Sequence, residues 1–292
     1  MTQLPITITL GDPAGIGPET IAKAFRDAPD ATQGCFVAGD VGTMRRASAL
    51  VSGPGQPALP VALITTPAEA WDVPPQCIPV LQITELLAPI PYGQISSLAG
   101  RVAADCVLWA SRAALRGELA ALVTAPLHKE ALAAAGLPYP GHTELLQFEA
   151  AAHMGKTLQE VPVRMMLAND ELRTVLVSIH LSLRQAIEAV TFDNVLQTLR
   201  ITHRAVGAAL GRAPRIGVAG LNPHAGEGGL FGREEIDTII PALQAARAEG
   251  LDVHGPFAPD TVFMRARAKN GQPGEFDVVV AMYHDQGLIP VK

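Results

Sequence analysis

Cysteine is scarce in this chain, and its spacing matches neither a disulfide framework nor a thiolate metal site. Cys35, Cys77 and Cys106 are odd in number and far apart, and no CxxC pair occurs. We therefore interpret them as small reduced side chains of a cytoplasmic protein.

Long apolar runs and an excess of positive charge are also lacking. No stretch of about 18 apolar residues is available to span a membrane, and residues 1–10 lack the basic and apolar parts of a signal peptide. The 22 lysines and arginines are outnumbered by 28 aspartates and glutamates, which gives a net charge of −6. This balance predicts no nucleic-acid partner, and an anionic substrate would have to be held by local donors.

Apolar residues are plentiful, at 48% of 292 residues against 17% charged, which indicates a folded chain with a substantial core. Short apolar runs alternate with helical patterns, as is typical of α/β proteins with a largely parallel sheet. The predicted strands are residues 6–10, 35–39, 121–124, 216–221 and 278–282, and the predicted helices are residues 19–26, 98–116, 144–152, 183–210 and 234–248.

One region departs from this alternation. Residues 163–167 and 174–180 are two apolar runs joined by a polar segment at residues 169–171, which predicts an antiparallel hairpin. A hairpin inserted in an α/β chain predicts a second domain with a mixed sheet.

A glycine-rich segment, GDPAGIGPE at residues 11–19, follows the first predicted strand and precedes a helix. Glycines let the backbone approach a ligand closely, and a helix start offers free N–H groups. Asp12, Gly15 and Gly17 are therefore candidate cofactor contacts. The glycine spacing differs from the dinucleotide fingerprint GxGxxG, and a tight turn without any ligand is the open alternative.

Three histidines lie at or just after the ends of predicted strands: His180, His224 and His284. Ligands of α/β sheets bind at the carboxyl ends of strands, so these imidazoles could converge. Three neutral imidazoles with an open fourth position form a normal catalytic site for zinc or a similar divalent ion. The alternative is that each histidine is structural or exposed.

Carboxylates accompany two of these histidines. Glu227 lies in the loop NPHAGEGG at residues 222–229, and Asp285 directly follows His284. Either could orient an imidazole from behind, or could be an ordinary solvated loop carboxylate.

A further polar segment, PGHTE at residues 140–144, precedes a predicted helix. Thr143 could cap that helix, and His142 and Thr143 could present a ring nitrogen and a hydroxyl to an anion. Lys129, after the predicted strand at residues 121–124, could bind phosphate, although a surface lysine is the simpler interpretation.

Together these segments resemble the 4-hydroxythreonine-4-phosphate dehydrogenase family of pyridoxal phosphate biosynthesis. The resemblance covers essentially the whole chain through an ordered set of motifs. They are GDPAGIGPE (11–19), TAPLHKEAL (124–132), PGHTELL (140–146), SIHLSLR (178–184), GLNPHAGEGGLFGREE (220–235), GPFAPDT (255–261) and AMYHDQGLIPVK (281–292).

The resemblance implies a two-domain fold like that of isocitrate and isopropylmalate dehydrogenases, with mixed sheets and flanking helices, which is not a Rossmann fold. We expect a cofactor-side domain of residues 1–124 plus 256–292, and a substrate, metal and dimerisation domain of residues 125–255. The resemblance also implies a homodimer whose active sites draw on both subunits. His180, His224 and His284 would bind a divalent metal, with zinc ahead of magnesium, cobalt, nickel and manganese. His142, Thr143 and Lys292 would contact the substrate.

The implied reaction is oxidation by NAD or NADP and β-decarboxylation of a small phosphorylated hydroxy acid, 4-hydroxythreonine 4-phosphate, to 3-amino-2-oxopropyl phosphate. The resemblance extends to paralogues that oxidise D-threonate or D-erythronate 4-phosphate, and less closely to aromatic cis-dihydrodiol dehydrogenases. A non-catalytic metal- or nucleotide-binding protein on the same fold is the alternative outside the enzymes. The family continues past the lysine that matches Lys292, so we expect either an incomplete sequence, which we favour, or a truncated and inactive protein.

Overall fold

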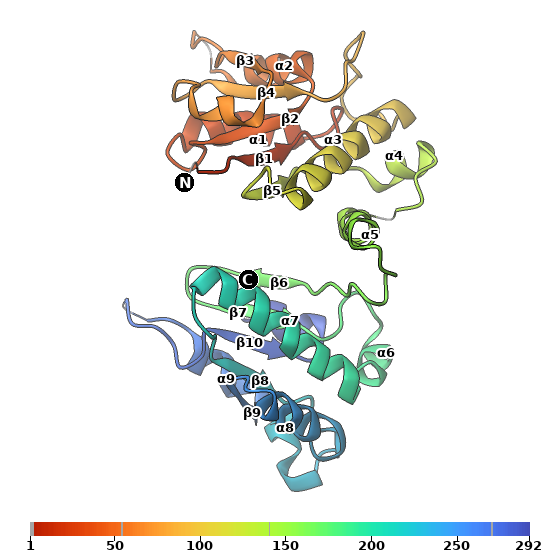
Figure 1. Cartoon of the computed structure of the whole chain (residues 1–292), viewed down its shortest axis with the longest axis vertical. Helices are drawn as coiled ribbons and strands as arrows, with labels where there is room; N and C mark the ends of the chain where they lie inside the picture. The colour runs from red at the N-terminus through yellow and green to blue at the C-terminus, as the bar shows by residue number, and fades with distance from the viewer. Residues whose placement is uncertain (1–2, 54, 140, 270) are drawn as a thin grey trace. The chain divides into compact units, whose positions relative to one another are not determined.

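The computed structural model describes residues 3–53, 55–139, 141–269 and 271–292, so Pro140 of the PGHTE segment lies outside the described residues (Figure 1). The chain forms two compact units, unit 1 (residues 1–162) and unit 2 (residues 163–292). Each unit has its own five-stranded sheet with flanking helices. The predicted α/β class is therefore confirmed.

Unit 1 is built on a parallel sheet with strand order β3-β4-β2-β1-β5. Its central strand β2 is buried on both faces, with Val37 packed against α1 and α2 and with Phe36 and Ala38 packed against α3. Successive side chains of a strand point to opposite faces, so an apolar strand can serve two layers of helices. The elements are β1 (Ile6–Thr9), α1 (Gly17–Asp27), β2 (Cys35–Gly39), α2 (Val41–Val51), β3 (Val61–Ile64), η1 (Pro67–Trp71), β4 (Ile78–Gln82), α3 (Ser97–Leu115), β5 (Ala121–Thr124), α4 (Lys129–Ala134) and α5 (His142–Met154).

Unit 2 has a mixed sheet with strand order β6-β7-β10-β8-β9, in which the β6–β7 pair is antiparallel. This pair is the predicted hairpin, which is confirmed. In β10, Val278 and Val280 belong to the core cluster that includes α7 and α8, whereas Val279 and Ala281 belong to the one that includes α9. The elements are β6 (Met166–Ala168), β7 (Arg173–Leu176), α6 (Leu183–Glu188), α7 (Phe192–Leu210), β8 (Ile216–Ala219), η2 (Pro223–Gly229), η3 (Glu235–Ile239), α8 (Ile240–Ala248), β9 (Val253–Phe257), α9 (Pro259–Ala266), β10 (Val278–Ala281) and α10 (His284–Leu288).

Two predicted helices are each interrupted. The stretch 183–210 forms α6 and α7 because Thr191 starts a new helix, its hydroxyl accepting a hydrogen bond from the Asn194 N–H at 3.3 Å. The stretch 234–248 begins with the π-helical turn η3, and α8 follows with Pro241 in its first turn. Apolar periodicity predicted that these residues are helical but did not predict where one helix ends and the next begins.

The two units divide the chain differently from the predicted domains, which joined residues 256–292 to residues 1–124. In the structure β10 lies between β7 and β8, and α9 packs on the same sheet, so residues 256–292 complete unit 2. The assignment of a cofactor side and a substrate side stays a prediction.

The three cysteines are unpaired thiols, and burial raises the pKa of Cys106 to about 12. The cytoplasmic location inferred from cysteine usage stays a prediction. Within the described ranges, no helix has both the length and the apolar character needed to cross a bilayer.

Asp277, just before β10, anchors the central strand of unit 2 through two arginines. Its carboxylate accepts hydrogen bonds from the guanidinium groups of Arg212 and Arg215 and from the Arg215 N–H, and its side chain is 7% exposed. Hydrogen bonds from Arg212 lead the effects that hold the pKa of Asp277 well below its usual range. This lowered pKa stabilises the fold above the unfolded aspartate value of about 3.9, and the contribution is lost as the pH falls below it.

Replacing Asp277 by asparagine is expected to lower the free energy of unfolding of unit 2 by about 2 kcal/mol at pH 7, because hydrogen bonds to a charged group are lost. The difference between wild type and variant should shrink as the pH falls below about 4, because Asp277 of the unfolded wild type gains its proton there while the folded carboxylate stays charged. Urea unfolding at several pH values measures this. The exposed pair Arg116–Glu118 offers a control, Glu118→Gln. A pH-independent difference would contradict the prediction.

Candidate active site

In unit 1, two of the motif segments meet at the carboxyl end of the sheet. The glycine-rich segment follows β1, and residues 125–128 follow the neighbouring strand β5. The Asp12 N–H donates to the Pro126 carbonyl at 2.9 Å, and a Cβ added at Gly11 would lie 2.4 Å from the same oxygen. The chain leaves β1 toward β2 on one side and returns to β5 on the other, so the segments lie at a topological switch point, where α/β sheets bind ligands.

The candidate cofactor residues lie in this turn, but packing explains part of their identity. The Asp12 carboxylate is buried and accepts from the Ala14 N–H at 2.8 Å, which closes the turn. A Cβ at Gly17 would lie 2.9 Å from the Leu10 carbonyl, so glycine is needed there without any ligand. The atoms nearest to a Cβ at Gly15 would be those of Asp12, at 3.3 Å or more. A cofactor role for these residues stays a prediction.

Arg46 on α2 holds this turn in place, although no sequence pattern pointed to it. Its guanidinium donates to the Pro13 carbonyl at 2.8 Å and to the Ile90 carbonyl at 2.7 Å. It also stacks 4.1 Å from the centre of the Tyr92 ring. A lone arginine in an amphipathic helix is usually solvated, and its partners are remote in sequence, so no local pattern reveals this contact.

His142 and Thr143 begin helix α5. The capping residue is Gly141, so the prediction that Thr143 caps the helix is wrong; Thr143 is the second helical residue and is exposed. His142 is half-buried, and its Nε2 has no hydrogen-bond partner among the described residues. Burial lowers the pKa of the imidazole. His142 thus offers a neutral ring nitrogen with unused hydrogen-bonding capacity.

We expect His142 to titrate below the ordinary histidine value of 6.5, because burial penalises the charged imidazolium. The ring should therefore be neutral at pH 7 and gain its proton only in more acidic solution. NMR titration of the ring resonances, assigned with a His142→Gln variant, measures this. A short peptide of residues 141–146 gives the unfolded reference, and a folded value at or above that of the peptide would contradict the expectation.

In unit 2, His180 and His284 lie close together, whereas the prediction concerned the convergence of three histidines. They follow the adjacent parallel strands β7 and β10, and their ring centres are 5.6 Å apart. Both line a cavity of about 460 Å³ together with Ser178, Tyr283 and Asp285. His284 Nδ1 is 2.7 Å from an Asp285 carboxylate oxygen, which favours a proton on Nδ1 and leaves Nε2 free to bind a ligand.

His224 does not join this pair within one chain. It lies in η2, its side chain is 65% exposed, and its Nδ1 is 3.5 Å from a Glu227 carboxylate oxygen. Within residues 3–53, 55–139, 141–269 and 271–292, no three histidine, cysteine or acidic side chains are grouped as metal ligands. The predicted site draws ligands from two subunits, so a single chain does not test it, and the three-histidine site stays a prediction.

Lys292 follows α10 and is exposed, with its N–H donating to the Leu288 carbonyl at 3.0 Å. The exposed side chain of Lys292 is compatible with binding a ligand and equally with simple solvation. Its substrate role stays a prediction.

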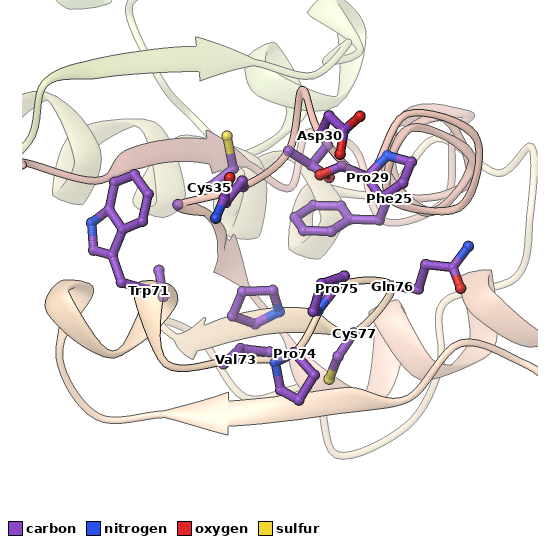
Figure 2. A pocket seen from close by; sticks show the side chains of 15 residues that line it. Phe25, Pro29, Asp30, Cys35, Trp71, Val73, Pro74, Pro75, Gln76 and Cys77 are labelled. Atoms are coloured by element: carbon purple, nitrogen blue, oxygen red, sulfur yellow. Dashed lines mark hydrogen bonds between the residues drawn. The ribbon is translucent and has the colours of Figure 1, made fainter.

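Another cavity of about 260 Å³ lies in unit 1, lined by apolar side chains such as Phe25, Trp71 and Pro75 and by polar ones such as Asp30 and Gln76 (Figure 2). Cys35, the first residue of β2, also lines it, so the cavity lies at the amino end of that strand. Because α/β sheets bind substrates at the carboxyl ends of their strands, we do not assign this cavity to the candidate active site.

Comparison with known proteins identifies the class of this protein. The chain is 48% identical over 292 residues to the 4-hydroxythreonine-4-phosphate dehydrogenase of Beijerinckia indica subsp. indica, covering all of the chain and 81% of the relative. It is 40% identical over 287 residues to the D-threonate 4-phosphate dehydrogenase of Pectobacterium atrosepticum, covering 98% of the chain and 83% of that relative. The crystal structure of the 4-hydroxythreonine-4-phosphate dehydrogenase of Klebsiella pneumoniae has a TM-score of 0.86 and 40% identity, covering 99% of the chain and 84% of that structure.

The protein is therefore a dehydrogenase, an oxidoreductase that acts on a CH–OH group. Residues 31–292 match the family described as Pyridoxal phosphate biosynthetic protein PdxA, and the chain belongs to this family. Membership confirms the resemblance drawn from the motifs, and it favours an enzyme over a non-catalytic binding protein.

Proposed function

We propose that this protein oxidises 4-hydroxythreonine 4-phosphate with NAD or NADP and a divalent metal, with β-decarboxylation to 3-amino-2-oxopropyl phosphate in pyridoxal phosphate (vitamin B6) biosynthesis. The names of the family and of the relative that is 48% identical support this substrate. The structural observation that carries the proposal is the pair His180 and His284, 5.6 Å apart at the carboxyl ends of adjacent strands.

The donor set of this pair fits a divalent ion. Imidazole nitrogens suit zinc, cobalt and nickel, and the contact of His284 with Asp285 is the kind of carboxylate–histidine contact that orients metal ligands. Two imidazoles leave the site incomplete, so we propose that His224 of a second copy supplies the third, which makes the enzyme a homodimer. When bound, the ion would polarise substrate oxygens and make the hydroxyl more acidic.

The phosphorylated substrate also needs anion-binding groups, since the chain has a net charge of −6. We propose that the neutral imidazole of His142 and the exposed hydroxyl of Thr143 at the start of α5 hydrogen-bond the substrate, helped by the N-terminal end of the helix. The ammonium of Lys292 adds a point charge suited to phosphate or carboxylate. The nicotinamide would accept hydride from the carbon that bears the hydroxyl, and the resulting β-keto acid would lose carbon dioxide.

D-Threonate 4-phosphate is the second candidate substrate, because the Pectobacterium relative that carries this name is 40% identical. D-Erythronate 4-phosphate shares its phosphate and its carboxylate. An aromatic cis-dihydrodiol ranks last, since it offers no phosphate to the proposed anion-binding groups.

The test is a screen of the three phosphorylated substrates with NAD and with NADP, in the presence of zinc, magnesium, cobalt, nickel or manganese. Formation of reduced nicotinamide measures oxidation, and released carbon dioxide measures decarboxylation. We expect turnover of 4-hydroxythreonine 4-phosphate that is lost on metal chelation. Turnover of D-threonate 4-phosphate alone would select the second candidate, and activity that survives chelation would contradict the metal role.

Replacing Lys292 by alanine is expected to lower kcat/KM for the phosphorylated substrate by about ten- to a hundredfold, because a charge-assisted contact is worth roughly 1.5–3 kcal/mol. Zinc content should not change, since Lys292 is not a proposed ligand. Steady-state kinetics and metal analysis measure the two effects. The exposed Lys156 gives the matched control, Lys156→Ala. Full kcat/KM in Lys292→Ala would remove this residue from the site.

A further inference from the structure

The loop that carries His224 has an unusual backbone. Residues 224–228 all have positive φ, at 53°, 52°, 79°, 43° and 65° in sequence order. Left-handed conformation costs roughly 1–2 kcal/mol for a residue with a Cβ atom, and His224, Ala225 and Glu227 each have one. Such a run persists only where its surroundings impose it, and strained backbone of this kind clusters at functional sites.

Glu235, the first residue of η3, occupies the inside of this loop. It is 1% exposed, and its Oε1 accepts hydrogen bonds from the N–H groups of Leu221 at 2.7 Å and Asn222 at 2.8 Å. Its Oε2 accepts from the Asn222 side-chain amide at 3.0 Å. A Cβ added at Gly226 would lie 2.7 Å from the same Oε2. The carboxylate therefore lies close both to the start of the loop, at residues 221–222, and to its middle, at Gly226.

Gln286 is hydrogen-bonded to the start of the same loop, at Gly220, and to the residue after β10. Its Nε2 donates to the Gly220 carbonyl at 2.7 Å, and its Oε1 accepts from the Met282 N–H at 2.7 Å. Met282 directly follows β10, and Gly220 directly follows β8, which pairs with β10. Gln286 therefore ties the segment that carries His284 to the loop that carries His224.

We propose that Glu235 and Gln286 are positioning residues for the metal site. They fix the backbone of residues 220–222 relative to the end of β10 and thereby set how this chain presents His224 to the metal site of a second copy. This inference rests on the proposed function, in which His224 and His284 are metal ligands. The side-chain hydrogen bonds of Glu235 and Gln286 go to residues 220–222 and to Met282, and within the described ranges none goes to a proposed substrate contact. The two residues would therefore affect the metal site by placing His224 and His284.

Two conservative variants test this role. Glu235→Gln keeps the shape of the side chain but sets an NH₂ group against the Asn222 amide, where the carboxylate accepts a hydrogen bond. Gln286→Met keeps the length of the side chain and removes both hydrogen bonds. Glu188→Gln and Gln244→Met, at exposed positions of α6 and α8, are the matched controls. His224→Ala tests the proposed metal role itself.

Three readouts apply to every variant: zinc affinity by competition with a chromophoric chelator, hydrogen exchange of the peptide covering residues 220–228, and the melting temperature. We expect Glu235→Gln and Gln286→Met to bind zinc about tenfold more weakly, the lower end of the effect of losing a group that orients a ligand. Exchange in the loop should be faster by about tenfold, because local opening becomes easier. Both controls should match the wild type, and His224→Ala should lose more zinc affinity than either positioning variant.

The outcomes separate the two claims. If His224→Ala binds zinc weakly while Glu235→Gln and Gln286→Met match the wild type in zinc affinity and loop exchange, the positioning role is overturned and the proposed function stands. If zinc affinity falls only in proportion to the unfolded fraction, the two residues merely stabilise the fold, which also overturns the inference. Wild-type zinc affinity in His224→Ala would overturn the proposed role of His224, and with it the inference.

Discussion

Replacing His284 by alanine is expected to lower kcat/KM by at least about a thousandfold, because polarisation of the substrate by a metal is worth several kcal/mol and each tenfold step is about 1.4 kcal/mol. His284 has the geometry of a ligand in two respects. Its ring lies 5.6 Å from that of His180, and Asp285 contacts its Nδ1 and so leaves Nε2 for the ion. Zinc content per chain should fall together with the activity.

The measurement combines steady-state kinetics with metal analysis of the purified variant. His153→Ala is the matched control, because His153 is an exposed histidine near the end of α5 and has no proposed role. A His284→Ala enzyme with wild-type zinc content and full activity would end the metal hypothesis for this pair.

The second large effect concerns Gly100 in α3, where the backbone of α4 approaches closely. A Cβ at Gly100 would lie 2.0 Å from the Ala131 carbonyl oxygen and 2.9 Å from the Leu132 nitrogen. Helix propensity alone would favour alanine by about 1 kcal/mol. Overpacking against backbone atoms outweighs this preference, so Gly100→Ala is expected to destabilise unit 1 by about 3 kcal/mol.

Urea unfolding of the wild type and the variant checks this expectation, with Leu98→Ala on the exposed face of the same helix as the control. The control should change the free energy of unfolding by less than about 0.5 kcal/mol. A stabilised Gly100→Ala variant would show that α4 moves away at little cost. Because α4 begins at Lys129, such movement would also make the TAPLHKEAL segment adaptable.

The strands predicted from apolar runs were found where burial on both faces left a clear signal, as in β2 and β10. Strands β4 and β9 were missed because Pro79, Gly255 and Pro256 interrupt their apolar pattern. These two segments are strands because they pair with β2 and β8, a tertiary contact that their local sequence does not show.

The candidate site was partly predictable for a topological reason. Adjacent parallel strands bring their carboxyl ends together, so the placement of His180 beside His284 follows once β7 and β10 are neighbours. The left-handed turn at His224 did not follow, because the base of its loop is hydrogen-bonded to Glu235, whose position in the chain is eleven residues beyond His224. Glu235 was predicted only as one residue of a helix, because no pattern in the neighbouring sequence indicates that its side chain is buried.

The strand order of unit 2 has a consequence for synthesis of the protein. Strand β10 lies between β7 and β8, yet about a hundred residues separate it from β7, which at ribosomal speeds takes roughly 5–20 s to synthesise. Until β10 emerges, β7 and β8 present unpaired edges of the kind that recruit other chains. In unit 1 the late strand is β5, which lies at the edge of the sheet, so β3, β4, β2 and β1 can pair with one another before it emerges. Nascent unit 2 should therefore depend on chaperones more than nascent unit 1, and the histidine pair is assembled last.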